Sequence, residues 1–208
     1  MYMTDIALQN DANASVAAAA IRAALERRSI VLVGMMGVGK SSIGRRLAAR
    51  LGIPFVDADT EIEKAAAMSI ADIFARHGEA DFRSGEARVI ARLLESGPQV
   101  LATGGGAVMN PATRAAIQAK AVSIWLSAEF DVLQRRISKR KNERPMLQTA
   151  DPAATLRELL LEREPIYAQA DLTVQSREVP HEAIVTDIVT ALAAFLNVSA
   201  APQGRSDA

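Results

Sequence analysis

The sequence predicts an α/β domain in which a parallel sheet is covered by helices on both faces. Two observations support this fold class. Short apolar runs alternate with longer amphipathic segments, and this alternation is typical of βαβ units with crossover helices. In addition, half of the 208 residues are apolar, which is enough for one sizeable core in a chain of this length.

The expected strands are short runs rich in β-branched residues. Continuous apolar runs of this kind favour strands that are buried on both sides, as in parallel sheets. In chain order the expected strands are Ile30–Val33, Phe55–Asp57, Val100–Ala102, Val122–Leu126 and Leu172–Val174.

The expected helices occupy the segments between these strands, where apolar residues recur with helical periodicity. The run 139–145 is highly charged and interrupts this periodicity, so we expect an exposed loop there. In chain order the expected helices are Ser41–Leu51, Asp59–Ala67, Ala71–Arg76, Glu79–Glu95, Ala112–Ala119, Glu129–Ser138, Ala153–Tyr167 and His181–Phe195.

Both ends of the chain fall outside this pattern. Residues 1–28 form an Ala-rich extension, in which Asn13 could cap a helix over 14–27. The alternative, which we favour, is a loosely attached and disordered extension. We expect the main domain to span 29–196 and residues 197–208 to form a flexible tail, because the end of the chain is small and polar.

Composition excludes several classes of function. The 24 basic and 24 acidic residues balance, which argues against nucleic acid or an anionic membrane as the main partner. There is no cysteine, so disulfides and thiolate chemistry are excluded. No apolar run approaches the ~20 residues of a membrane span, and no signal-peptide pattern is present. We therefore expect a cytoplasmic protein.

The segment from Gly34 to Ser41 matches the phosphate-binding pattern G-x-x-x-x-G-K-[ST]. It lies between an expected strand and an expected helix, where backbone N–H groups can surround an anion. Lys40 would reach the terminal phosphates of a nucleotide, and the Ser41 hydroxyl would bind Mg²⁺. A glycine-rich turn that matches by chance is the alternative, but the flanking elements favour a site for a nucleoside triphosphate.

Two further motifs follow strand ends, where ligands of open α/β sheets gather. Asp57 and Asp59 could face one site, one binding Mg²⁺ and the other a substrate hydroxyl; alternatively, Asp59 only caps the next helix. The triplet Gly104-Gly105-Gly106 would let a ligand approach the backbone, although a flexible surface turn is also open.

Three arginines are weaker candidates. Arg144 lies in the charged loop and could add positive charge beside the γ-phosphate, or could simply be solvated. Arg163 could hold a carboxylate with its fork, or could pair with the glutamates beside it. Nothing local distinguishes Arg83, and we assign no role to His77 or His181.

Together these residues resemble the shikimate kinase family, whose members phosphorylate the 3-hydroxyl of shikimate. The resemblance extends from Ile30 to Phe195. The phosphate loop is shared by many NTPases, but the ordered series is specific. It comprises Gly37-Val38-Gly39-Lys40-Ser41-Ser42, Asp57-Ala58-Asp59, Ser69-Ile70-Ala71-Asp72-Ile73-Phe74, Gly78-Glu79, Phe82-Arg83, Gly104-Gly105-Gly106-Ala107-Val108, Arg144-Pro145 and Arg163-x-x-x-Tyr167.

The resemblance implies a P-loop NTPase fold of the NMP-kinase type, with three αβα layers, a five-stranded parallel sheet and a lid over about 138–152. It implies ATP and shikimate as substrates, Mg²⁺ as cofactor, a monomer, and a place in chorismate and aromatic amino acid biosynthesis. It implies no nucleic acid or membrane partner.

The resemblance also implies a role for each motif residue. Lys40, Asp59 and Arg144 would be catalytic, with Asp59 as the candidate base. Mg²⁺ would bind Ser41 and Asp57. The ATP phosphates would bind Gly37, Val38, Gly39, Lys40, Ser41, Ser42 and Arg144. Shikimate would bind Asp59, Arg83, Gly104, Gly105, Gly106 and Arg163, with the two arginines on its carboxylate.

Two other functions stay open. A gluconate-type kinase of the same fold is the nearest rival, and the paired acids, the glycine triplet and Arg163 favour shikimate over it. A regulatory module that binds a nucleotide without catalysis is the second. The intact Lys40, Asp57, Asp59 and Arg144 argue against that alternative.

Overall fold

The computed structural model describes residues 15–139, 149 and 151–198 and contains a five-stranded parallel sheet. The strand order is β2-β3-β1-β4-β5. All five expected strands are confirmed, with small extensions at their ends. They are β1 (Ser29–Val33), β2 (Phe55–Asp57), β3 (Val100–Ala102), β4 (Ala121–Ser127) and β5 (Leu172–Gln175).

The expected helices are confirmed with one difference. Two expected helices join as α4, which kinks at Gly78, where φ is 79° and ψ is 175°. No described helix is both long and apolar enough to cross a membrane. The helices are α2 (Lys40–Leu51), α3 (Ala58–Ala66), α4 (Ile70–Leu93), α5 (Pro111–Lys120), α6 (Phe130–Ser138), α7 (Pro152–Tyr167) and α8 (His181–Phe195), together with an unpredicted 3₁₀ turn, η1 (Ala107–Met109).

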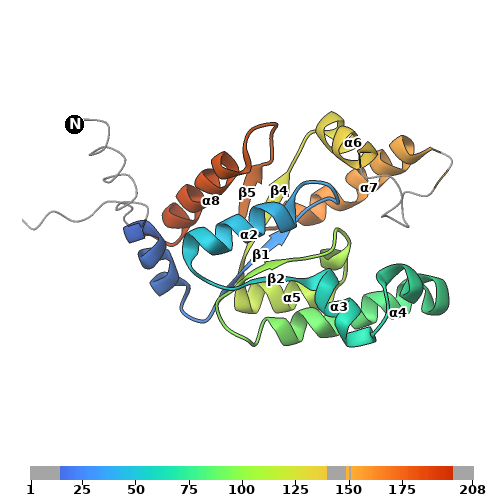
Figure 1. Cartoon of the computed structure of the whole chain (residues 1–208), viewed down its shortest axis with the longest axis horizontal. Coiled ribbons are helices and arrows are strands. Elements are labelled where there is room, and N and C mark those ends of the chain that lie inside the picture. Colours follow the sequence, from blue (N-terminus) through green and yellow to red (C-terminus); the bar gives the residue numbers. More distant parts are fainter. Residues whose placement is uncertain (1–14, 140–148, 150, 199–208) are drawn as a thin grey trace, which may run out of the picture.

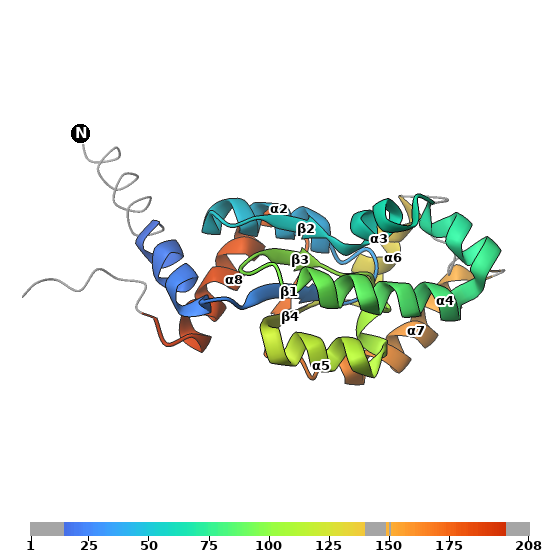
Figure 2. The same cartoon turned by 90° about the horizontal axis from the view of Figure 1, so that it is seen from below.

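The helices lie in layers on the two faces of the sheet, as expected. Figures 1 and 2 show α2 and α8 on one face and α5 with the second half of α4 on the other. Beyond one end of the sheet, α6 and α7 form one group and α3 with the start of α4 forms another (Figure 1). The strands run parallel, so the loops that follow them gather at one edge.

The main core surrounds the central strand. All five residues of β1 are buried, because the strand has a neighbour on each side and helices on each face. Ile30 pairs with Val100 of β3 and with Val122 of β4. A second, smaller apolar cluster lies apart from this core, between α3 and α4, and its buried members are Ile62, Ile73 and Phe82.

The N-terminal segment differs from our expectation. Residues 15–25 form a helix, and Ile21 and Leu25 are fully buried in the main core. Arg22 donates from Nη1 to the carbonyl of Leu51, at 2.6 Å. Loose attachment is therefore wrong for this segment. Its apolar side chains recur at helical spacing, a signal that the alanine-rich composition obscured. Residues 1–14 and the tail 199–208 lie outside the described residues.

Candidate active site

A cavity of about 850 Å³ opens at the carboxyl edge of the sheet. Segments that are distant in sequence meet there: the phosphate loop, the β2–α3 junction, α4, the loop after β3, and α7. The cavity therefore brings together all the predicted site residues that the structure describes, except the buried Val38. Its lining includes Gly37, Gly39, Lys40, Ser41, Ser42, Asp57, Asp59, Arg83, Gly104, Gly105, Gly106 and Arg163.

The phosphate loop joins β1 to α2 and is tied to its surroundings through backbone carbonyls. Lys40 is buried, and its Nζ donates to the carbonyls of Gly34 at 2.7 Å and Met35 at 3.1 Å. The carbonyl of Val38 accepts from Ser176 Oγ at 2.8 Å and from Arg136 Nη1 at 3.3 Å. The first turn of α2 contains no acidic residue, so its N–H groups favour an anion in the cavity.

Asp57 connects the phosphate loop to the start of α3. Its Oδ2 accepts from the Ser41 hydroxyl at 2.6 Å, and its Oδ1 accepts from the backbone N–H of Asp59 at 3.2 Å. The helix cap is thus Asp57 rather than Asp59, which corrects the alternative we considered for Asp59. Ser41 and Asp57 offer two oxygen donors at the cavity edge, which is the kind of partial ligand set that Mg²⁺ takes when phosphates and water complete its shell.

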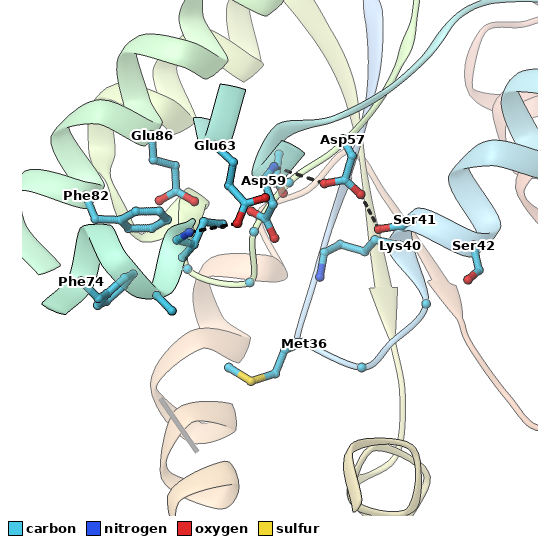
Figure 3. Close-up of a pocket in the computed structure, with 18 of the residues that line it drawn as sticks. Met36, Lys40, Ser41, Ser42, Asp57, Asp59, Glu63, Phe74, Phe82 and Glu86 are labelled. Atoms are coloured by element: carbon cyan, nitrogen blue, oxygen red, sulfur yellow. Dashed lines mark hydrogen bonds between the residues drawn. The ribbon is translucent and has the colours of Figure 1, made fainter. Parts of the chain in front are cut away.

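Asp59 lies in the first turn of α3, and its carboxylate faces the cavity together with Lys40 (Figure 3). Burial and the neighbouring Asp57 raise the pKa of Asp59 above its ordinary value, while Lys40 opposes this shift. A carboxylate with a raised pKa is a stronger base than an exposed one. Asp59 therefore combines access to the cavity with greater affinity for a proton.

Arg83 lies on α4 between two glutamates. Its Nη1 is 2.7 Å from Glu86 Oε2, and its Nη2 is 3.1 Å from Glu79 Oε1. Glu86 is only 1% exposed, and burial raises its pKa although Arg83 opposes the shift. Sequence reasoning missed Glu86. Its spacing of three residues from Arg83 on one helix was the available signal.

The glycine triplet follows β3 and is packed closely. It therefore does not form a flexible surface turn. A Cβ atom on Gly104 would lie 2.8 Å from Glu86 Oε1, and one on Gly106 would overlap the Arg83 guanidinium. Side chains at these positions would displace the charged groups of α4. The triplet is thus needed for the close approach of these α4 side chains, and the approach of a ligand to its backbone stays a prediction.

Arg163 completes the cavity wall from α7. It is 3% exposed, whereas the neighbouring Glu162 and Glu164 are exposed, so its side chain lies on the buried face of the helix. A Cβ atom on Gly105 would lie 3.7 Å from Arg163 Nη1. Two arginines from different helices therefore reach neighbouring glycines of one loop, an arrangement suited to a carboxylate.

A family model described as Shikimate kinase matches residues 36–193, which is more than half of the chain. The chain belongs to the shikimate kinase family. A shikimate kinase from Bradyrhizobium diazoefficiens is 61% identical over 205 residues, covering 99% of this chain and 97% of the relative. One from Rhodopseudomonas palustris is 60% identical over 185 residues, covering 89% and 90%.

Solved structures agree with this family. The structure of shikimate kinase from Acinetobacter baumannii in complex with shikimate superposes with a TM-score of 0.77 at 34% identity. The superposition covers 81% of this chain and 94% of that one. These findings confirm the family that the motifs indicated and the expected P-loop fold of a shikimate kinase.

Some site residues of this shikimate kinase family member were not predicted, and one that was predicted is not described. Arg136, Lys139 and His181 line the cavity, although no local motif marks them. Burial, Arg46 and Arg136 lower the pKa of His181. Arg144 and most of the expected lid lie outside the described residues, so the role of Arg144 stays a prediction.

Proposed function

We propose that this chain transfers the γ-phosphoryl group of ATP to the 3-hydroxyl of shikimate, giving shikimate 3-phosphate and ADP in aromatic amino acid biosynthesis. One observation carries the proposal. Asp59 lines a cavity that also contains Lys40, on the phosphate side, and Arg83 and Arg163, on the substrate side. A carboxylate for a hydroxyl group thus lies between a phosphate site and two carboxylate-binding arginines. Shikimate is a triol with one carboxylate, and its groups match this order.

The phosphate side would hold ATP through the loop of residues 37–42. N–H groups at the start of α2 would bind the phosphates, and Lys40 would turn from its carbonyl partners to the transferring group. Ser41 and Asp57 would hold Mg²⁺, Asp57 through water, and the ion would neutralise charge that develops on the phosphates. Arg144 would add a further positive charge from the lid.

The substrate side would position the hydroxyl for in-line attack. Arg83 and Arg163 would bind the carboxylate, and backbone groups of Gly104, Gly105 and Gly106 would contact the ring. As the hydroxyl oxygen bonds to the γ-phosphorus, its proton would pass to Asp59 and the bond to ADP would break. Phosphoryl transfer depends mainly on positioning and charge neutralisation, which these groups supply.

The direct test is ADP release from Mg·ATP in a coupled assay, with shikimate, gluconate and quinate as separate acceptors. We expect strong stimulation by shikimate alone. Stimulation by gluconate would instead identify the chain as a gluconate-type kinase of the same fold. ATP binding without stimulation by any acceptor would favour a regulatory module.

We propose further that the protein acts as a cytoplasmic monomer without a nucleic-acid partner. The balanced charge of the chain supports the absence of a nucleic-acid partner, and the family resemblance supports a monomer. Light scattering after size-exclusion chromatography should give the mass of one 22.2 kDa chain. A dimer mass that persists on dilution would contradict this state.

A further inference from the structure

The glycine loop is joined to α7 by one side chain that the proposed mechanism does not use. Tyr167, the last residue of α7, donates its hydroxyl hydrogen to the carbonyl of Gly105. The neighbouring glycines are held differently, since their carbonyls accept from backbone N–H groups of Ala107 and Met109. Gly105 is thus fixed by a contact with a residue 62 positions away in the sequence.

Tyr167 is held by its packing in the main core. Its side chain is 1% exposed and lies in the main core, with its ring 6.1 Å from that of Trp125 on β4. Burial raises the pKa of Tyr167 to about 12, so the hydroxyl stays protonated and keeps its donor at any ordinary assay pH. The contact with Gly105 therefore anchors the loop to the main core.

Arg163 lies on the same face of α7, four residues before Tyr167. Residues four apart lie side by side on a helix, and both side chains are buried. On its other flanks the loop meets Glu86 and Arg83, which belong to α4. Without an anchor to α7, the position of the loop relative to Arg163 would depend on the α4 side chains and on the phosphate-loop backbone at Met36 and Gly34.

We propose that Tyr167 is a positioning residue for shikimate, because its hydroxyl keeps the glycine loop in register with Arg163. The inference rests on the proposed function. Tyr167 itself contacts no substrate in this scheme. It acts by fixing the distance between the backbone that would contact the ring and the guanidinium that would bind the carboxylate.

The test compares Tyr167→Phe with Ser123→Ala. The first change removes only the hydroxyl, which holds Gly105 and also interacts with the Arg163 side chain. The second removes a buried hydroxyl that bonds Asp171 Oδ2 at 2.7 Å and is not in contact with the loop. Three quantities are measured for each variant: KM for shikimate, KM for ATP, and hydrogen exchange of the amides in 104–107 without any substrate.

We expect Tyr167→Phe to raise KM for shikimate about three- to tenfold, the effect of one lost hydrogen bond, and to speed exchange in 104–107. KM for ATP and kcat should stay within about twofold, and Ser123→Ala should change none of these quantities. An unchanged KM for shikimate would overturn the proposal even if the melting temperature falls, because Tyr167 would then be only structural.

The two readouts separate this inference from the proposed function. If the unaltered chain shows no activity with shikimate, the proposed function fails, and the exchange measurement still decides whether Tyr167 anchors the loop. Unchanged exchange in Tyr167→Phe would overturn the anchor itself. A cooperative thermal unfolding transition shows in either case that the variant has folded.

Discussion

The phosphate loop packs against the main core. The segment that faces it across the cavity contains a small apolar cluster of its own. Met35, Val38 and Lys40 are buried, and the loop carbonyls are held by hydrogen bonds. The opposite wall consists of α3 and the first part of α4, where Ile62, Ile73 and Phe82 form a separate cluster, whereas the second half of α4 packs in the main core. One side of the cavity is therefore part of the sheet scaffold, and the other is attached to it.

The two sides also differ in their electrostatics. On the substrate side, burial raises the pKa of both Asp59 and Glu86, so acids are held there in an environment that disfavours their charge. On the phosphate side, the loop carries a buried lysine that is bonded to carbonyls. The comparison indicates that burying the charged Asp59 and Glu86 costs the substrate side stability, and that this burial makes Asp59 a stronger base.

The largest effect should come from Asp59→Asn. We expect kcat to fall about 10³-fold, because the amide cannot accept the proton and acid–base groups contribute about 10²–10⁴. Rate assays with saturating ATP and shikimate measure this. A kcat close to that of the unaltered chain would contradict the role given to Asp59.

The same variant should be more stable at neutral pH. The pKa of Asp59 is raised in the fold, so the unfolded chain releases this proton at lower pH, and the ionised carboxylate destabilises the fold above that range. Asn removes this cost. The melting temperature should therefore rise at pH 7, and the difference should shrink as pH falls toward 3.8.

Lys40→Ala tests the other side of the comparison. We expect kcat to fall about 10²–10³-fold, the usual loss when one charge-stabilising donor is removed. The dissociation constant of shikimate, measured by calorimetry, should be unchanged because Lys40 belongs to the phosphate side. Lys120→Ala, which removes an exposed lysine that pairs with Glu95, is the matched control and should leave kcat unaltered.

Arg163→Lys should act on shikimate alone. A lysine keeps the charge but loses the fork, so KM for shikimate should rise at least about tenfold while kcat and KM for ATP change much less. Arg157→Lys is the control on the same helix, where the arginine stacks over Phe130. An equal rise in both variants would show that the effect comes from α7 as a whole.

Ser176→Ala should give the smallest effect. It removes the hydrogen bond that Ser176 donates to the carbonyl of Val38 and the one that Ser176 accepts from Arg136, while Arg136 still contacts that carbonyl. We expect KM for ATP to rise about two- to threefold and KM for shikimate to stay constant. A rise in KM for shikimate would contradict the separation of the two sides.

The sequence predicted the phosphate side well because that side is local. Strand, loop and helix are adjacent in the chain, so one motif contains both the structure and its chemistry. The substrate side is assembled from four separate segments, and Arg83 had no local signal until the family resemblance supplied one. Glu86 and Tyr167 could not be identified as neighbours of the glycine loop, because their contacts depend on the tertiary packing of α4 and α7.

The helix of residues 15–25 shows that the family-model match and the folded domain begin at different residues. The match to the family model begins at residue 36, after the central strand has already ended. The boundary of the cooperative folding unit lies earlier, since Ile21 and Leu25 fill the same core as that strand. A fragment trimmed to residues 36–193 would lose the middle of its sheet and the start of its phosphate loop, together with the helix of residues 15–25.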